Sequence, residues 1–382
     1  MRSGSTTPRR ALDPTAVLVL LVATTGACTL DERQLAYGSD ARDTEPEDAR
    51  DLAPEDVHDF TPPPAWTNID LLFVVDDSGS MSQEQAALAT ALPNFFDALF
   101  DSAATRGVDA NVNVGVVATD MGTRGYAVST CSDPIAGHDG CLQNTPSPSL
   151  TDCDPVPPSF LNRQLSYGDL YPIDALAHDF ACIATLGTAG CGFEQQLEAG
   201  RKALIDNTAP GGCTSGLVRE NSVIGLIFVT DEDDCSVRAS HPEMFDQERT
   251  DLGHLNIRCF LHGDFLSTVE EYVAALRGLE GEGHRLVVGA LVGVPLDEPA
   301  CTGFGDSLDG CLDVPAMEQS IDPAQPTQLV PSCNTSMGMA FPPTRFVRLA
   351  QTLGATAYVA SICSPDYQPA LVAIAWQIVD QL

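Results

Sequence analysis

Residues 69–81 read IDLLFVVDDSGSM, and this stretch decides how the rest of the chain is interpreted. Leu71 to Val75 is apolar without alternation, which is typical of a parallel strand that is covered on both faces. The run stops at two carboxylates, and Gly79 permits a tight turn into the helical pattern that follows. The stretch therefore predicts a central strand of an α/β sheet with a polar loop at its carboxyl end.

Three side chains with oxygen atoms, Asp76, Ser78 and Ser80, alternate along that loop. Open α/β sheets bind ligands at the carboxyl ends of their strands. One carboxylate and two hydroxyls are hard oxygen donors of the kind that Mg²⁺ takes. The loop therefore predicts a divalent-cation site. The alternative is an ordinary turn in which Ser78 or Ser80 caps the following helix.

A second apolar strand ends in acidic residues at FVTDEDD, residues 228–234. Together with the Asp-x-Ser-x-Ser loop, this strand end resembles the metal-ion-dependent adhesion site of von Willebrand factor type A domains. The resemblance implies a doubly wound, mostly parallel, Rossmann-like α/β fold. It also implies Asp231 as the far-side carboxylate and a threonine before a helix as a further ligand. Thr188 is our candidate and Thr185 the alternative, while Glu194 is either a first-turn helix acid or a ligand.

The acidic end of this second strand is longer than the resemblance implies. The family usually has a glycine where Glu232 stands, and a cluster of this kind can recruit Ca²⁺ or Mn²⁺ in place of the Mg²⁺ that we expect first. We expect Asp233 and Asp234 to be solvated loop charges. With Asp76 and Asp231 as its only carboxylates, the ion would stay electrophilic enough to accept a carboxylate from a protein or peptide ligand.

Five apolar runs alternate with helical patterns, which predicts right-handed crossovers and a doubly wound α/β fold. The expected strands are Leu71–Val75, Val112–Val117, Val223–Val229, Leu286–Val292 and Tyr358–Ile362. The expected helices run over 82–100, from about Gly192, over 265–276, over 346–353 and over 371–382. Tyr126–Val128 is our choice for the family's short antiparallel strand. Asp120, at the end of the second strand, is expected to be a solvated turn residue.

Three segments do not fit the family pattern and are interpreted as insertions, at about 122–185, 235–263 and 295–343. They are rich in cysteine and proline, which argues for ordered loops closed by disulfides. The first insertion enters and leaves near the metal-bearing edge of the sheet. We therefore expect it to shape the binding surface of a single domain over residues 67–382.

The chain has 13 cysteines, and twelve remain when Cys28 is set aside. An even set in an acidic, exported chain predicts a framework of disulfides, because no two cysteines have the spacing of a zinc knuckle. Local closures are expected for Cys235 with Cys259 and for Cys301 with Cys311. The twelve are Cys131, Cys141, Cys153, Cys182, Cys191, Cys213, Cys235, Cys259, Cys301, Cys311, Cys333 and Cys363.

The first residues carry an export signal. Arginines precede an apolar run over 16–23 that is too short to span a bilayer. The following Thr-Gly-Ala-Cys resembles a bacterial lipobox, so we expect a signal peptide over 1–27 and a lipid on Cys28, with ordinary signal cleavage as the alternative. Residues 28–66 are acidic and contain a proline run, which predicts a disordered tether. The expected location is the surface or periplasmic side of a bacterial envelope.

The net charge of −34, from 53 acidic and 19 basic residues, argues against nucleic acid or an anionic lipid surface as a partner. Contact with a membrane is expected through the lipid anchor only. Gly305-Asp306-Ser307-Leu308 spells an esterase motif, but it lacks a buried preceding strand and a downstream histidine. We therefore expect no enzyme activity.

The sequence thus predicts an envelope-anchored module that binds a protein or peptide through a divalent cation. Two alternatives stay open. In the first, the cation only stabilises an envelope domain. In the second, the insertions build a secreted hydrolase.

Overall fold

The computed structural model describes residues 67–382 apart from 148–149, 151, 157–158 and 164–169. The expected signal peptide over 1–27, the lipid on Cys28 and the tether over 28–66 lie outside the described residues. Within the described part, no helix is both long and apolar enough to cross a membrane.

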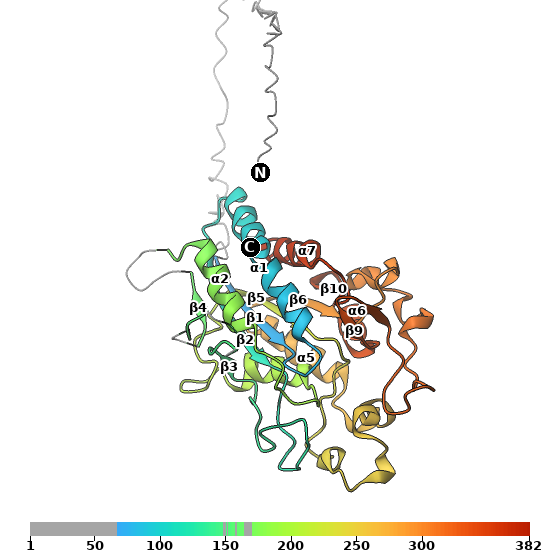
Figure 1. The fold of residues 1–382 in the computed structure, drawn as a ribbon. Helices are drawn as coiled ribbons and strands as arrows, with labels where there is room; N and C mark the ends of the chain where they lie inside the picture. Colours follow the sequence, from blue (N-terminus) through green and yellow to red (C-terminus); the bar gives the residue numbers. More distant parts are fainter. Residues whose placement is uncertain (1–66, 148–149, 151, 157–158, 164–169) are drawn as a thin grey trace, which may run out of the picture. The chain divides into compact units, whose positions relative to one another are not determined.

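Five parallel strands form the centre of the sheet, in the order β2-β1-β5-β6-β10. They are β1 (Asn68–Val75), β2 (Asn111–Ala118), β5 (Ser222–Val229), β6 (Arg285–Val292) and β10 (Ala357–Ser361). Side chains of all five are buried on both faces, as runs of Val, Ile and Leu require. The prediction of an α/β fold with a mostly parallel sheet is confirmed (Figure 1).

The strand order reverses between β1 and β5. The chain passes from β1 to β2 on one side and then returns to pair β5 with the other side of β1. Val75 is the register partner of Val229, so β1 and β5 end side by side. Sheets of this kind bind ligands outside the carboxyl ends of the strands at such a reversal.

Short antiparallel strands complete both edges of the sheet. β3 (Leu142–Gln143) and β4 (Leu161–Asn162) pair with β2, and β7 (Gly303–Phe304) pairs with β10. The prediction of an antiparallel strand at Tyr126–Val128 is wrong. Hydrogen bonds from Tyr126 N to Thr123 O and from Cys131 N to Val128 O turn the chain there instead.

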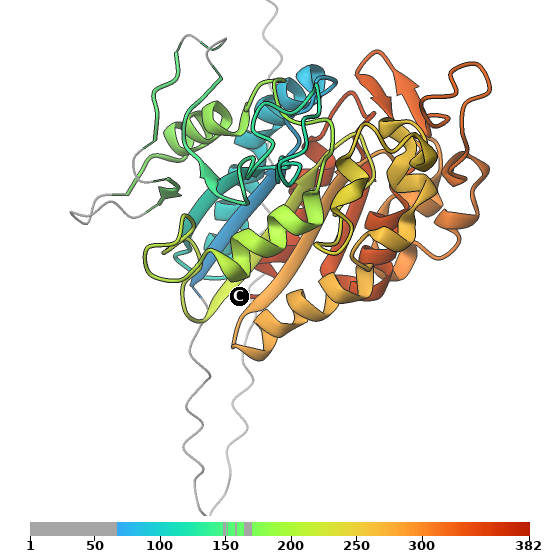
Figure 2. The same cartoon turned by 90° about the horizontal axis from the view of Figure 1, so that it is seen from below.

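Helices cover both faces of the sheet (Figures 1 and 2). Neighbouring residues of β1 mark the two layers: Phe73 belongs to the apolar core that contains α1, α2 and α7, whereas Leu72 belongs to the core that contains α3, α5 and α6. The first layer consists of α1 (Ser82–Thr105), α2 (Ile173–Ala184) and α7 (Gln368–Val379). The second consists of α3 (Gln196–Arg201) with the π-helical turn η1 (Lys202–Asp206), α5 (Val269–Gly281) and α6 (Thr344–Leu353).

Three of these helices differ from the expectation. α3 begins at Gln196 and not near Gly192, because Glu194 is held in a β-bridge with Asp120. α5 begins after Thr268, whose hydroxyl accepts from the N–H of Glu271 in a capping box. α2 lies inside the first insertion, where the sequence analysis placed no helix.

Six disulfides anchor the insertions, and the expected framework is confirmed. The two local closures, Cys235–Cys259 and Cys301–Cys311, are present. The other pairs are Cys131–Cys191, Cys141–Cys213, Cys153–Cys182 and Cys333–Cys363. Three of these four join the first or the third insertion to a segment outside it, so these two insertions are fastened to the body of the domain.

Short elements fill the second and third insertions. The second contains η2 (Pro242–Phe245), η3 (Thr250–Leu252), η4 (Leu255–Ile257), α4 (Arg258–Leu261) and the start of η5 (Gly263–Phe265). The third contains η6 (Pro299–Cys301), β7, η7 (Gly305–Ser307), η8 (Cys311–Asp313), η9 (Pro315–Met317) and the hairpin β8 (Cys333–Thr335) with β9 (Gly338–Ala340). A further turn, η10 (Gly354–Thr356), precedes β10.

The second insertion is built around one buried cation, Arg258. Its side chain is 2% exposed, and its guanidinium donates to four backbone carbonyls. The acceptors are the carbonyls of Met244, Asp246, Arg249 and Gly253. A planar guanidinium has enough donors in a fixed fork to satisfy all four, which a lysine cannot do.

We expect Arg258→Met to destabilise the protein, because the four carbonyls would lose a charged donor while staying buried. The free energy of unfolding should fall by about 3 kcal/mol or more, measured by denaturant unfolding of the oxidised protein. Arg277→Met is the control, since Arg277 is an exposed arginine on α5 that donates to a single carbonyl. Equal stability of the two variants would contradict this role of Arg258.

Candidate functional site

Asp76 lies where the sheet order reverses, and the pairing of β1 with β5 fixes its position. Its N–H donates to the carbonyl of Val229 at 3.0 Å. Oδ1 of Asp76 accepts from the N–H of Ser78 at 2.8 Å, and Oδ2 accepts from the hydroxyl of Thr230 at 2.7 Å. The side chain is fully buried. One carboxylate is thus oriented by donors from both strand ends.

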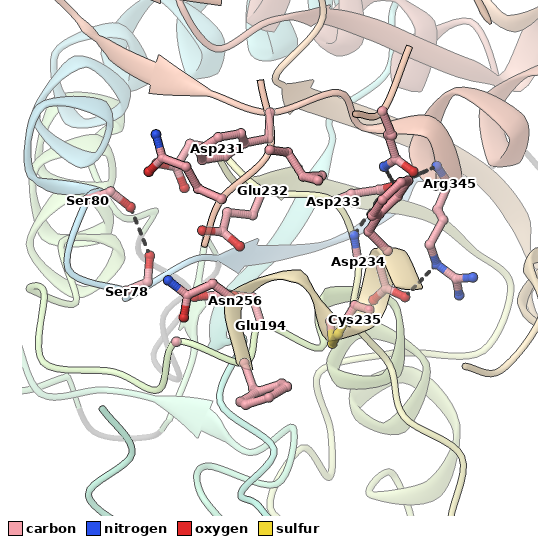
Figure 3. A pocket seen from close by; sticks show the side chains of 18 of the residues that line it. Ser78, Ser80, Glu194, Asp231, Glu232, Asp233, Asp234, Cys235, Asn256 and Arg345 are labelled. Carbon is pink, nitrogen blue, oxygen red and sulfur yellow. Dashed lines mark hydrogen bonds and ion pairs between the residues drawn. A yellow bond between two sulfur atoms is a disulfide. The ribbon is translucent and has the colours of Figure 1, made fainter. Parts of the chain in front are cut away.

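The loop after β1 presents Ser78 and Ser80 to the same place. Their hydroxyl oxygens lie 3.2 Å apart, and Ser80 is exposed whereas Ser78 is buried (Figure 3). Gln85 on α1 clamps the loop, because its amide donates to the carbonyls of Asp76 and Gly187. The hydroxyl pair is therefore held close to Asp76.

Asp231, at the end of β5, completes this group. It is 1% exposed, and its carbonyl accepts from the N–H of Phe341 at 2.8 Å. Its carboxylate oxygen Oδ1 is buried and finds no hydrogen-bond partner among the described residues. An unpartnered buried carboxylate oxygen is costly unless something else binds it.

Two further carboxyl groups, those of Glu194 and Glu232, lie close to Asp231, and Glu194 is the residue for which a role as a ligand was left open. Glu194 is 2% exposed, and its carboxyl group and that of Glu232 each influence the pKa of the other. Figure 3 shows Glu194 and Glu232 beside Ser78, Ser80 and Asp231. Four carboxyl groups, and not two, therefore gather at the ends of β1 and β5. The β-bridge to Asp120 sets Glu194 here, ahead of the first turn of α3.

Neither candidate threonine joins this group. Thr188 is exposed and does not line the pocket that the other residues share. The hydroxyl of Thr185 donates to the carbonyl of Ala181 at the end of α2. The segment that leads from Thr188 to Glu194 is held against Asp77 instead. The N–H of Gly190 donates to the carbonyl of Asp77, and a Cβ at Gly190 would lie 2.2 Å from the carboxyl carbon of Asp77.

Asp233 and Asp234 are not solvated loop charges as expected. Asp234 is 1% exposed and accepts from the N–H of Leu197 at 2.8 Å and from Nε of Arg345 at 3.0 Å. Asp233 accepts from the hydroxyl of Thr344 at 2.9 Å and from the N–H of Arg345. These carboxylates lie at the N-termini of α3 and α6, where a helix dipole favours negative charge.

Asp120 is also buried and not a solvated turn residue. It is 3% exposed, accepts from the N–H of Gly122 at 2.8 Å, and its pKa is raised by burial. Nearby, Nε2 of His138 lies 3.6 Å from Oδ2 of Asp77. The nearby carboxylate of Asp77 raises the pKa of His138. This pair fastens the first insertion to the loop after β1.

A pocket of about 620 Å³ opens over the carboxyl ends of β1 and β5. Ser78, Ser80, Glu194, Asp231 and Glu232 line one part of it. The remaining walls come mainly from the second and third insertions and from the start of α6. The first insertion, which we expected to shape this surface, contributes only Thr130 to the lining.

The carboxyl groups of the pocket repel one another. Burial, opposed by hydrogen bonds, raises the pKa of Asp76 to about 6 and that of Glu232 to about 7. Burial and the charges of neighbouring carboxylates raise the pKa values of Asp231 and Glu194 well above their usual range. Acidic side chains are thus concentrated where the strand order reverses between β1 and β5, the switch point of the sheet, and their burial and mutual repulsion oppose ionisation.

No three His, Cys, Asp or Glu side chains of the described segments are arranged as a metal-binding group. Carboxylates alone therefore do not form a closed chelate here. The oxygen donors that do converge are of mixed type: the hydroxyls of Ser78 and Ser80 with the carboxylate of Asp231, and Asp76 behind them.

The esterase-like motif lies elsewhere, beside the edge strand β7. Its Ser307 hydroxyl donates to the carbonyl of Phe304 at 2.7 Å.

No family model matches the chain, and no curated protein matches it. Among solved structures, it is similar to the pilus adhesin SpaC from Lactobacillus rhamnosus GG, with 13% identity and a TM-score of 0.29. That likeness covers 61% of this chain and 26% of the adhesin, so the chain spans about a quarter of its length. Disulfides persist in oxidising compartments, so the six pairs in the described part of the chain indicate an extracellular or surface protein.

The raised pKa values predict how stability depends on pH when no cation is present. Groups whose folded-state pKa is raised stabilise the fold at low pH, and that contribution is lost as the pH rises through about 6 to 7. In chelator, we expect the melting temperature to fall between about pH 5.5 and 7.5, by an amount equivalent to a few kcal/mol. Scanning calorimetry at several pH values measures this slope.

The double variant Asp76→Asn with Glu232→Gln should flatten the slope, because neither amide titrates. Asp233 remains in this variant, and burial raises its pKa to about 6 as well. A smaller slope that persists in the double variant is therefore expected from groups such as Asp233. A melting temperature that rises over this range in chelator, or a slope that the double variant leaves unchanged, would show that these carboxyl groups do not carry the effect.

Proposed function

We propose that this chain is an exported protein-binding module of the von Willebrand factor type A kind. In it, a divalent cation at the switch point engages a carboxylate of a protein or peptide ligand. The observation that carries the proposal is the buried, unpartnered Oδ1 of Asp231 beside the hydroxyls of Ser78 and Ser80, at the base of an open pocket. The parallel strand order, with its reversal between β1 and β5, supports the type A interpretation.

The residues present fit a hard cation. Ser78, Ser80 and Asp231 would hold it, with Asp76 orienting the loop and contributing charge. Oxygen donors of this kind suit Mg²⁺, Ca²⁺ and Mn²⁺. The cation would supply positive charge to which a ligand's carboxylate can bind. The protein's own part is to orient the donors, which it does through the strand ends and through the Gln85 clamp.

The identity of the cation depends on Glu194 and Glu232. Mg²⁺ keeps several waters and needs few carboxylates, whereas Ca²⁺ accepts six to eight oxygens in flexible geometry. Two extra carboxyl groups at the pocket therefore shift our preference from Mg²⁺ toward Ca²⁺. The lipid expected on Cys28 would anchor this module to a membrane.

Glu194 and Glu232 also favour a second function. If Glu194 and Glu232 both ionise around the cation in addition to Asp76 and Asp231, the four carboxylates more than neutralise its charge. The cation would then stabilise the domain without binding a ligand. The two functions differ in whether ligand binding is lost together with the cation while the fold persists.

The test uses the mature wild-type protein and Asp76→Ala, each immobilised and exposed to envelope proteins of the source organism. The buffer contains Ca²⁺, Mg²⁺, Mn²⁺ or a chelator. We expect a partner to be captured by the wild type with a cation and to be lost in chelator and with Asp76→Ala. Glu232→Gln should change the affinity by less, about tenfold at most, because it removes one peripheral charge. Asp101→Ala, an exposed aspartate on α1, is the matched control.

Circular dichroism and thermal unfolding of each variant show whether the fold persists. If Asp76→Ala is folded and captures the same partner with unchanged affinity in chelator, the adhesion mechanism is wrong. If instead the cation raises the melting temperature and no capture depends on it, the structural function takes its place.

A further inference from the structure

The pocket extends well beyond the cation-binding edge, to a wall that the insertions provide. Partly exposed apolar side chains line it: Leu255 and Phe260 come from the second insertion, and Leu329, Met339 and Phe341 come from the third. Phe260 is 36% exposed. A concave site of about 620 Å³ with apolar walls fits a single segment of chain better than the flat face of a folded protein.

The second insertion is held rigidly where it forms this wall. Cys235, next to Asp234, is joined to Cys259, and the guanidinium of the adjacent Arg258 fixes the backbone of the same insertion between Met244 and Gly253. The hairpin of the third insertion is joined to the end of β10 by Cys333–Cys363. The wall is thus a preformed surface, which lowers the entropic cost of binding a ligand.

The charges of the pocket are separated along its length. Figure 3 places Arg345 across the pocket from Ser78 and Ser80. Arg345 is neutralised by Asp234, at 3.0 Å. Arg348 follows on the same helix, also lines the pocket and is exposed. In the described part of the chain it forms no ion pair. Arg348 therefore contributes one unpaired positive charge at the end of the pocket that α6 forms.

We propose that the pocket binds an extended peptide segment of a partner protein that carries two acidic groups separated by apolar side chains. One carboxylate would reach the cation at Ser78, Ser80 and Asp231, and the other would pair with Arg348. The apolar side chains between them would contact the wall formed by the insertions. This inference rests on the proposed function for the first carboxylate, and Arg348 and the wall extend it to the partner's chemistry. Complementary charge at both ends would also fix the direction of the segment.

The test is an array of short synthetic peptides, probed with the mature protein in Ca²⁺ and in chelator. The array varies the number of acidic residues, their spacing and the apolar residues between them. Peptides with two acidic residues around an apolar pair should bind better than peptides with one. Arg348→Glu should weaken the two-acid peptides by about tenfold or more, because it replaces an attraction with a repulsion. It should leave the one-acid peptides unchanged.

Two further variants complete the test. Arg348→Lys keeps the charge and should keep most of the affinity, and Arg277→Glu makes the same charge change away from the pocket and should have no effect. The inference is overturned if Arg348→Glu binds two-acid peptides as the wild type does. It is equally overturned if one-acid peptides bind as tightly as two-acid peptides, or if no peptide binds the wild type. Binding that needs Arg348 but survives chelator would instead contradict the proposed function alone.

Discussion

The in-register parallel pairing of β1 with β5 is the constraint on which the site depends. Because Val75 and Val229 are partners, the strands end together, and the next residue of each brings its polar side chain to the same point. The hydrogen bond from the Thr230 hydroxyl to Asp76 joins the two ends, which lie 154 residues apart in the chain. A slip of one residue would turn Asp76 to the opposite face of the sheet and separate it from Asp231.

The insertions turn this strand edge into a pocket. A parallel sheet alone offers only an open edge at the switch point, whereas the second and third insertions add walls and are fastened by disulfides. Asp233 and Asp234 connect these parts, since they bind backbone and side-chain groups of α3 and α6. The acidic run after β5 therefore has two roles: its first residues face the pocket, and its last residues hold the surrounding helices in place.

Much of the fold could be predicted from the sequence, because buried parallel strands are continuous apolar runs whose ends are visible. Asp76 and Asp231 were found for that reason. Glu194 could not be placed, because its position depends on a β-bridge to Asp120, 74 residues earlier in the chain. Thr188 was implied by the family resemblance, and the hydrogen bond from Gly190 to Asp77 holds its segment outside the pocket. The role of Asp234 depends on Arg345, which lies 111 residues further along the chain.

The central claim is that Ser78, Ser80 and Asp231 hold a divalent cation at the switch point. Its most direct test is anomalous X-ray diffraction from crystals of the mature protein grown with Mn²⁺, whose signal identifies the ion without reference to function. The account predicts an anomalous peak within coordination distance of the Asp231 carboxylate and the two serine hydroxyls. A well-ordered loop after β1 without such a peak, or a peak at other residues only, would contradict it.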